Sequence, residues 1–169
     1  MKFSSANFDS LRNLYLSQVQ KLLSSEQQIA AALPGFLGLT SDAQLRQLLE
    51  THLEETAGHI WRLEQILKDS LGEATAVRSR VMAAMLGESG GLVSGIADSS
   101  VRDAAIIAAA QQIEQFEIAC YGTLRHFARV LGETAQAQLL DQTIQEEGRA
   151  DHVLTGLAGR MNAYARFAA

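Results

Sequence analysis

The sequence contains one cysteine and one proline, and long apolar runs are missing from it. Cys120 alone can form neither an intramolecular disulfide nor a cysteine-based zinc site. Lys and Arg form no continuous stripe and the pI is about 5.3, so nucleic acid is not an expected partner. No apolar run is long enough to cross a bilayer, and residues 1–20 lack the apolar block of a secretory signal. We therefore expect a cytoplasmic protein without a membrane partner.

The residues that are present predict one helical domain over residues 1–169. Hydrophobic residues make up 47% of the chain, which is enough for a sizeable core. Proline occurs only at position 34, and glycine is sparse within four long stretches of helical periodicity. We expect helices over about residues 7–33, 41–70, 100–131 and 134–165, with the first helix ending at Pro34.

Local signals suggest how these helices begin and connect. Ser41 followed by Gln44, and Ser100 followed by Asp103, have the spacing of capping boxes. Several glycines break up residues 72–99, which predicts a long crossover with one or two short helices. The other connections are short and favour antiparallel helix pairs. The expected fold is all-α, a ferritin-like four-helix bundle with one long crossover between its second and third helices.

Acidic residues interrupt the apolar stripe of every predicted helix, at positions where a core would take Leu or Ile. A single Glu on such a stripe usually means a wrongly assigned register or a solvated edge. Here the interruptions fall near one depth on all four helices, at spacings of three and four residues that keep two side chains on one face. Burying so much like charge requires a positive group in the same cavity. The predicted metal ligands are Glu26, Glu55, His59, Glu114, Glu117, Glu147 and Asp151.

The net charge and the ligand types favour iron. The formal net charge is −5, and without the six inward carboxylates the other 13 acidic residues nearly balance the 14 basic ones. Oxygen-rich ligand sets with one or two imidazoles suit iron or manganese, whereas structural zinc prefers thiolates and calcium usually takes loop carbonyls. We expect two iron ions per chain, with manganese as the second choice. His52 is interpreted as an outer hydrogen-bond partner or an ordinary helix histidine, and not as a ligand.

Three stretches of the sequence resemble a known family. They are HLEETAGHIWRLEQIL (52–67), RDAAIIAAAQQIEQFEIACYGTL (102–124) and EEGRADHVLTGLA (146–158), and they are similar to the YciF/YciE family of ferritin-like bacterial stress proteins, a domain of unknown function. The resemblance implies a rubrerythrin-like bundle, a homodimer, a di-iron site and no established reaction.

The resemblance also implies ligand roles for particular residues. Glu26 takes the place of the first-helix carboxylate, Glu55 and Glu147 those of the second and fourth helices, and Glu114 with Glu117 resembles the rubrerythrin Glu-x-x-Glu pair. The di-iron pattern has His three residues after Glu. Here His59 follows Glu55 by four residues, and Asp151 stands where a His would follow Glu147.

The leading functional hypothesis is a carboxylate-bridged dinuclear centre that oxidises ferrous iron or reduces peroxide. The reaction is inferred from metal chemistry and analogy, because the sequence has no nucleophile motif or phosphate loop. The alternative is a non-catalytic structural or stress protein whose site is vestigial or purely structural. A manganese catalase-like enzyme is a more distant third hypothesis.

Overall fold

The computed structural model describes residues 9–167, and every regular element in this range is an α-helix. The helices are α1 (Leu11–Leu39), α2 (Ala43–Leu71), α3 (Arg80–Ser94), α4 (Ser99–Val130) and α5 (Thr134–Ala165). The prediction of an all-helical chain is confirmed, and the limits of the last two long helices are close to those expected. Residues 7 and 8, where the first helix was expected to begin, lie outside the described range.

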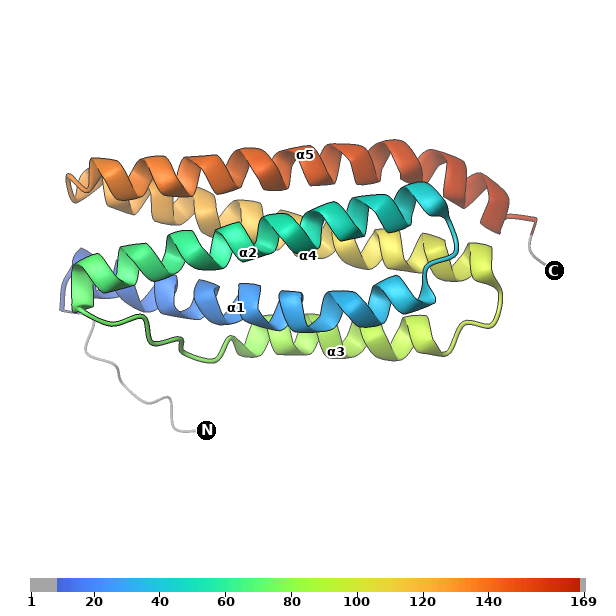
Figure 1. Cartoon of the computed structure of the whole chain (residues 1–169), viewed down its shortest axis with the longest axis horizontal. Coiled ribbons are helices and arrows are strands. Elements are labelled where there is room, and N and C mark those ends of the chain that lie inside the picture. Colours follow the sequence, from blue (N-terminus) through green and yellow to red (C-terminus); the bar gives the residue numbers. More distant parts are fainter. Residues whose placement is uncertain (1–8, 168–169) are drawn as a thin grey trace.

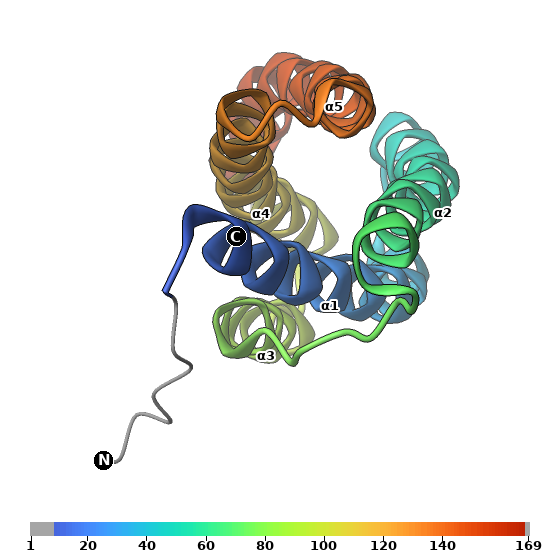
Figure 2. The same ribbon diagram turned by 90° about the vertical axis from the view of Figure 1, so that its left-hand side faces the viewer.

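The four long helices run side by side along the length of the molecule (Figure 1). Viewed from one end, α1, α2, α4 and α5 surround a common axis, and α3 lies outside them against α1 and α4 (Figure 2). The pairs α1–α2 and α4–α5 are antiparallel hairpins, as the short connections predicted. The crossover of residues 72–98 returns the chain along the bundle before α4 begins.

The first helix does not end at Pro34, so that prediction is wrong. Helix α1 continues through this exposed proline to Leu39. Proline removes one helical hydrogen bond, but the residues after it gain apolar contacts, since Phe36 and Leu39 pack against the core. The end of the helix is also well satisfied, because the Thr40 N–H and hydroxyl both donate to the Phe36 carbonyl. Tertiary packing therefore outweighs the local stop signal.

The crossover forms one helix in the described chain, and its glycines do not break it. Gly87, Gly90 and Gly91 lie within α3. Ser79 caps the helix by accepting a hydrogen bond from the Met82 N–H, and Met82 is fully buried. Packing of one apolar face against α1 and α4 thus holds a helix together despite its low intrinsic propensity.

The predicted capping boxes are wrong in detail. Asp42, one residue after Ser41, caps α2 by accepting from Gln44 N–H and Leu45 N–H, and Asp98 caps α4. Asp103 is fully buried and reaches across to the α1–α2 turn. It accepts hydrogen bonds from Ser41 N–H at 2.9 Å, from Asp42 N–H at 2.8 Å and from the Ser41 hydroxyl. Asp103 therefore joins the two hairpins at one end of the molecule.

Two apolar clusters fill the interior at opposite ends of the long helices. The first contains Tyr15, Leu16, Val19, Leu22, Leu23, Leu63, Ile66, Leu67, Tyr121, Leu124, Ala128, Ala137 and Leu140. The second contains Ile29, Leu33, Leu45, Leu49, Met82, Val93, Ile106, Ile107, Ile113, Leu154, Leu157 and Met161. On each long helix a buried polar segment separates the two clusters. No helix of the described chain combines the length and apolar character that a membrane crossing requires.

We expect Asp103→Asn to lower the free energy of unfolding by about 1–3 kcal/mol, because its amide group would face backbone N–H donors instead of accepting from them. Urea unfolding followed by circular dichroism measures the change. Asp69→Asn, on the exposed surface of α2, is the matched control. Equal stability of the two variants would show that the Asp103 hydrogen bonds contribute nothing net.

A candidate metal centre between the two apolar clusters

The buried polar segments of the four long helices meet in one layer. Its carboxylates and imidazoles are all nearly or fully buried: Glu26 from α1, His52 and His59 from α2, Glu114 and Glu117 from α4, and Glu147 from α5. Each of these side chains lies on the face that its helix buries, between apolar residues of the first cluster on one side and the second on the other. The helical period thus directs six donors inward at one depth.

These donors form two groups that share one residue. His52, Glu114, Glu117 and Glu147 each offer an atom within 4.8 Å of the others, and so do Glu26, His59 and Glu147. The two oxygens of Glu147 face opposite ways: Oε1 lies 3.1 Å from His59 Nδ1, and Oε2 lies 3.9 Å from His52 Nδ1. This is the arrangement expected of a carboxylate that bridges two cations.

The remaining contacts divide in the same way. His59 Nδ1 also lies 3.4 Å from Glu26 Oε1, whereas His52 Nε2 lies 3.5 Å from Glu114 Oε1. The Tyr121 hydroxyl donates a hydrogen bond to Glu26 Oε1. One oxygen of Glu26 is therefore oriented by Tyr121, which packs in the first apolar cluster.

Unsatisfied polar atoms single out this layer within residues 9–167. Eight buried side-chain atoms there make no hydrogen bond, although several lie close to an oppositely charged neighbour. All of them belong to the six donor residues: Glu26 Oε2, His52 Nδ1, His59 Nδ1, Glu114 Oε2, both oxygens of Glu117 and both oxygens of Glu147. Buried polar atoms are nearly always paired in folded proteins. Six of the eight atoms are carboxylate oxygens, and their concentration in one place calls for an additional positive partner.

The electrostatics of the layer reflect burial and crowding of like charges. Burial, reinforced by the neighbouring charge of Glu147, raises the pKa of Glu114 to about 11. Burial and the charges of Glu26 and Glu147 also raise the pKa of Glu117 well above its usual range. Burial acts to lower the pKa of His59, but the close carboxylates of Glu147 and Glu26 outweigh this effect and bring the pKa to about 10. These raised pKa values favour protonated Glu114, Glu117 and His59 when no cation is bound, which reduces the repulsion between the carboxylates.

An outer carboxylate supports His59 from the other side. His59 Nε2 lies 3.0 Å from Glu146 Oε2, and the Arg62 guanidinium binds both oxygens of Glu146. Arg62 also donates to the Thr143 hydroxyl at 3.0 Å. Burial tends to raise the pKa of Glu146, but Arg62 and His59 overcome this effect and lower it. A charged Glu146 fixes the ring orientation that turns Nδ1 of His59 toward the layer.

Two of the seven predicted ligands lie outside the cluster. Glu55 is partly exposed and lies 3.6 Å from the Arg149 guanidinium, and Asp151 accepts a hydrogen bond from the Gln115 amide at 2.8 Å. The structure brings the other five predicted residues together and adds His52. The spacing of seven residues between His52 and His59, two helical turns, is the sequence signal that places both histidines on the buried face.

The fold and the layer together define a class: an all-helical protein whose long helices enclose a buried cluster of carboxylates and histidines. The chain belongs to the family DUF892, a domain of unknown function, whose model matches residues 10–166. It is 35% identical over 153 residues to protein YciF of Escherichia coli strain K12, over 90% of this chain and 92% of YciF. The resemblance to the YciF family is thereby confirmed.

Solved structures agree with this assignment. The crystal structure of the Escherichia coli stress protein YciF matches with a TM-score of 0.86 at 34% identity, over 91% of this chain and 98% of YciF. YcfI from Rhodopseudomonas palustris matches with a TM-score of 0.87 at 35% identity, over 90% of this chain and 98% of that one. The family and its fold are thus established for nearly the whole described chain.

The pKa shifts predict that the metal-free protein loses stability as the pH rises. Glu114 and His59 bind their protons more tightly in the folded state than in the unfolded state, where the pKa values are near 4.5 and 6.5. Stability from both groups is therefore complete at low pH, begins to fall above these unfolded values and is lost as the pH approaches the raised folded values. We expect the melting temperature of the metal-free protein to fall between about pH 6 and about pH 9.

Scanning calorimetry of chelator-treated protein measures this slope. Glu114→Gln should flatten it, because the neutral amide does not titrate, whereas Glu88→Gln on the exposed surface of α3 should leave it unchanged. A melting temperature that rises over this interval would contradict the assignment of protons to the layer.

Proposed function

We propose that this protein is a ferritin-like four-helix-bundle stress protein that binds a dinuclear iron centre, with manganese as the second choice. The observation that carries the proposal is the set of eight unpaired buried atoms, all on six carboxylate and histidine side chains. Bundles of this class build such sites from side chains on facing helices.

The donor set fits two divalent cations in charge and chemistry. Four carboxylates and two neutral imidazoles contribute a charge that two divalent ions would balance. The ligands are oxygen and nitrogen without thiolate, which favours iron or manganese over structural zinc. All six come from helix interiors and none is a loop carbonyl, which argues against calcium.

The geometry suggests a role for each residue. Glu147 would bridge the two ions, with Glu26 and His59 completing one position. His52, Glu114 and Glu117 would complete the other. Tyr121 would orient Glu26, and Glu146 with Arg62 would orient His59.

Bound iron would supply redox chemistry with a small oxidant. Oxidation of ferrous iron is the reaction we favour, with peroxide reduction as the second. Ferrous iron brings its own electrons, whereas a peroxidase cycle needs a donor, and one cysteine cannot form a rubredoxin-type four-cysteine iron site within the chain. The homodimer implied by the family resemblance remains a prediction that sedimentation analysis would test.

Metal analysis of three variants tests the proposal. Protein grown with added iron and purified without chelator should contain about two irons per chain. Glu147→Ala should lower this content to one or none and should lower the melting temperature, because the shared ligand is lost. The matched controls are Glu55→Ala and Asp151→Ala, which we expect to retain the metal.

Two outcomes would change this interpretation. Wild-type protein that folds stably and binds neither iron nor manganese would favour the structural, non-catalytic alternative. Loss of metal from Glu55→Ala or Asp151→Ala as well as from Glu147→Ala would instead restore the ligand set expected from the sequence.

Glu146 should matter for metal affinity although it lies outside the donor groups. We expect Glu146→Gln to weaken iron or manganese binding by about 10- to 100-fold, the usual effect of losing a carboxylate that orients a ligating histidine. Competition with a chromogenic chelator measures the affinity. Glu64→Gln, which removes a surface ion pair with Lys68 on α2, is the control, and equal affinities for both variants would show that Glu146 does not support the site.

A further inference from the structure

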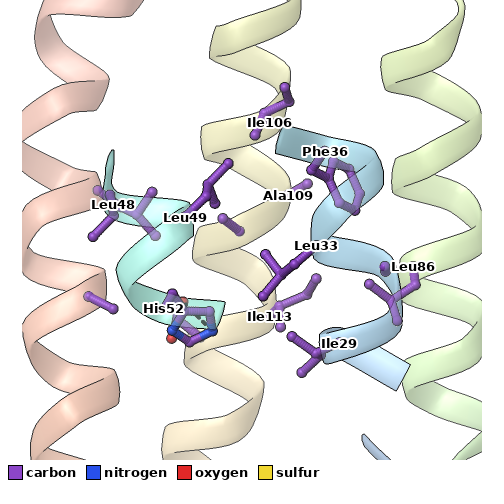
Figure 3. Close-up of a pocket in the computed structure, with 15 residues that line it drawn as sticks. Ile29, Leu33, Phe36, Leu48, Leu49, His52, Leu86, Ile106, Ala109 and Ile113 are labelled. Atoms are coloured by element: carbon purple, nitrogen blue, oxygen red, sulfur yellow. Dashed lines mark ion pairs between the residues drawn. The ribbon is translucent and has the colours of Figure 1, made fainter. Parts of the chain in front are cut away.

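An apolar cavity of about 40 Å³ lies against the His52 and Glu114 side of the donor layer. Figure 3 shows His52 at one end of this cavity, with Leu49, Ile113 and Leu33 nearby. All five helices contribute to its wall, and His52 and Glu114 are the polar side chains among the fifteen lining residues. The cavity therefore joins the second apolar cluster to one half of the donor layer.

Particular features of the chain create this space. Alanines at positions 32, 109, 110 and 150 leave room where larger side chains would meet. Phe36, from the part of α1 that continues past Pro34, and Leu86, from the crossover helix α3, close the outer wall (Figure 3). Both closing residues belong to segments whose local sequence does not favour a helix, so packing around the cavity helps to keep these segments helical.

The size and chemistry of the cavity limit what it can hold. Pockets for drug-sized ligands usually have volumes of about 300–1,000 Å³, so this cavity suits a molecule of a few atoms. A buried water typically makes about three hydrogen bonds, whereas this wall offers only two polar side chains at one end. Apolar cavities in proteins stay dry and take up apolar guests such as xenon. A small apolar molecule is therefore favoured over water or peroxide.

We propose that this cavity holds dioxygen beside the His52 and Glu114 half of the metal centre, so that dioxygen and not peroxide is the oxidant. Two ferrous ions would each give up one electron, and dioxygen would take up these two electrons and two protons to become hydrogen peroxide. This inference rests on the proposed function, because it assigns the second substrate of the same site. Peroxide is polar and would lose its hydrogen bonds to water on entering the cavity, whereas dioxygen has none to lose.

Xenon tests the cavity directly, without any metal chemistry. Crystals of the wild-type protein held under xenon pressure should show a xenon atom within contact distance of Ala109 and Leu49. Ala109→Leu should abolish this density, because the larger side chain fills the space. Ala135→Leu, an exposed position in the first turn of α5, should leave it unchanged. Absence of xenon from the wild-type cavity overturns the proposal.

Oxygen dependence tests the assignment of the substrate. In iron-supplied protein, Ala109→Leu should raise the dioxygen concentration for half-maximal ferrous oxidation several-fold, with metal content equal to that of Ala135→Leu. Ala109→Val adds less volume and should raise the same dioxygen concentration by a smaller factor. This variant replaces Ala109→Leu if the leucine variant does not fold. A dioxygen dependence identical to wild type in a folded Ala109 variant overturns the proposal.

The two hypotheses fail in different ways. If xenon occupies the cavity but the protein binds no metal, both the metal centre and the dioxygen assignment are refuted. The presence of the cavity is still confirmed in that case. Two irons per chain with no xenon site, or with peroxide as the faster oxidant, would refute the dioxygen assignment and leave the metal centre standing.

Discussion

The burial of four carboxylates between two apolar clusters is the constraint on which the rest of this structure depends. A carboxylate removed from water needs a proton, a hydrogen-bond donor or a cation. The layer contains two histidines and one tyrosine hydroxyl for four carboxylates, and it leaves eight polar atoms without hydrogen bonds. The protein can keep such a layer only because the apolar clusters on either side supply the stability that the layer itself does not.

The surroundings of the layer differ on its two sides. On the side of His59 the environment is charged, because Glu146 and Arg62 lie behind the imidazole and Tyr121 orients Glu26. On the side of His52 the environment is an apolar cavity that reaches into the second cluster. On the His59 side, charged contacts fix the orientation of the donor side chains. On the His52 side, the cavity leaves space for a small molecule. In the proposed dinuclear centre, this asymmetry would give the two halves different tasks, with ligand orientation on one side and small-molecule access on the other.

Membership in the YciF family accounts for the fold of nearly the whole chain, and the two solved relatives at about one-third identity share that fold. The family description carries no activity, so function has to be argued from the site. Three features of the site are specific to its chemistry: the two-sided contacts of Glu147, the clustering of unpaired atoms and the cavity at His52.

The sequence by itself determined that the chain is helical, that acidic side chains from three of the long helices face inward, and that His59 joins them from the fourth. These features follow from local periodicity, since a 3.6-residue repeat decides which side chains share a face. This periodicity is sufficient to place Glu26, His59, Glu114, Glu117 and Glu147 in one layer.

Only the tertiary structure decided which borderline residues join the layer and where the helices end. Glu55 and His52 lie three residues apart on α2. The packing of α2 against its neighbours sets the orientation of this helix about its axis, so that His52 is buried and Glu55 lies beside Arg149. In the same way, apolar contacts of Phe36 and Leu39 carry α1 past Pro34. The free energy that decides both outcomes comes from packing against residues distant in sequence. Local helix propensities, which amount to a few tenths to about 3 kcal/mol per residue, do not include this packing.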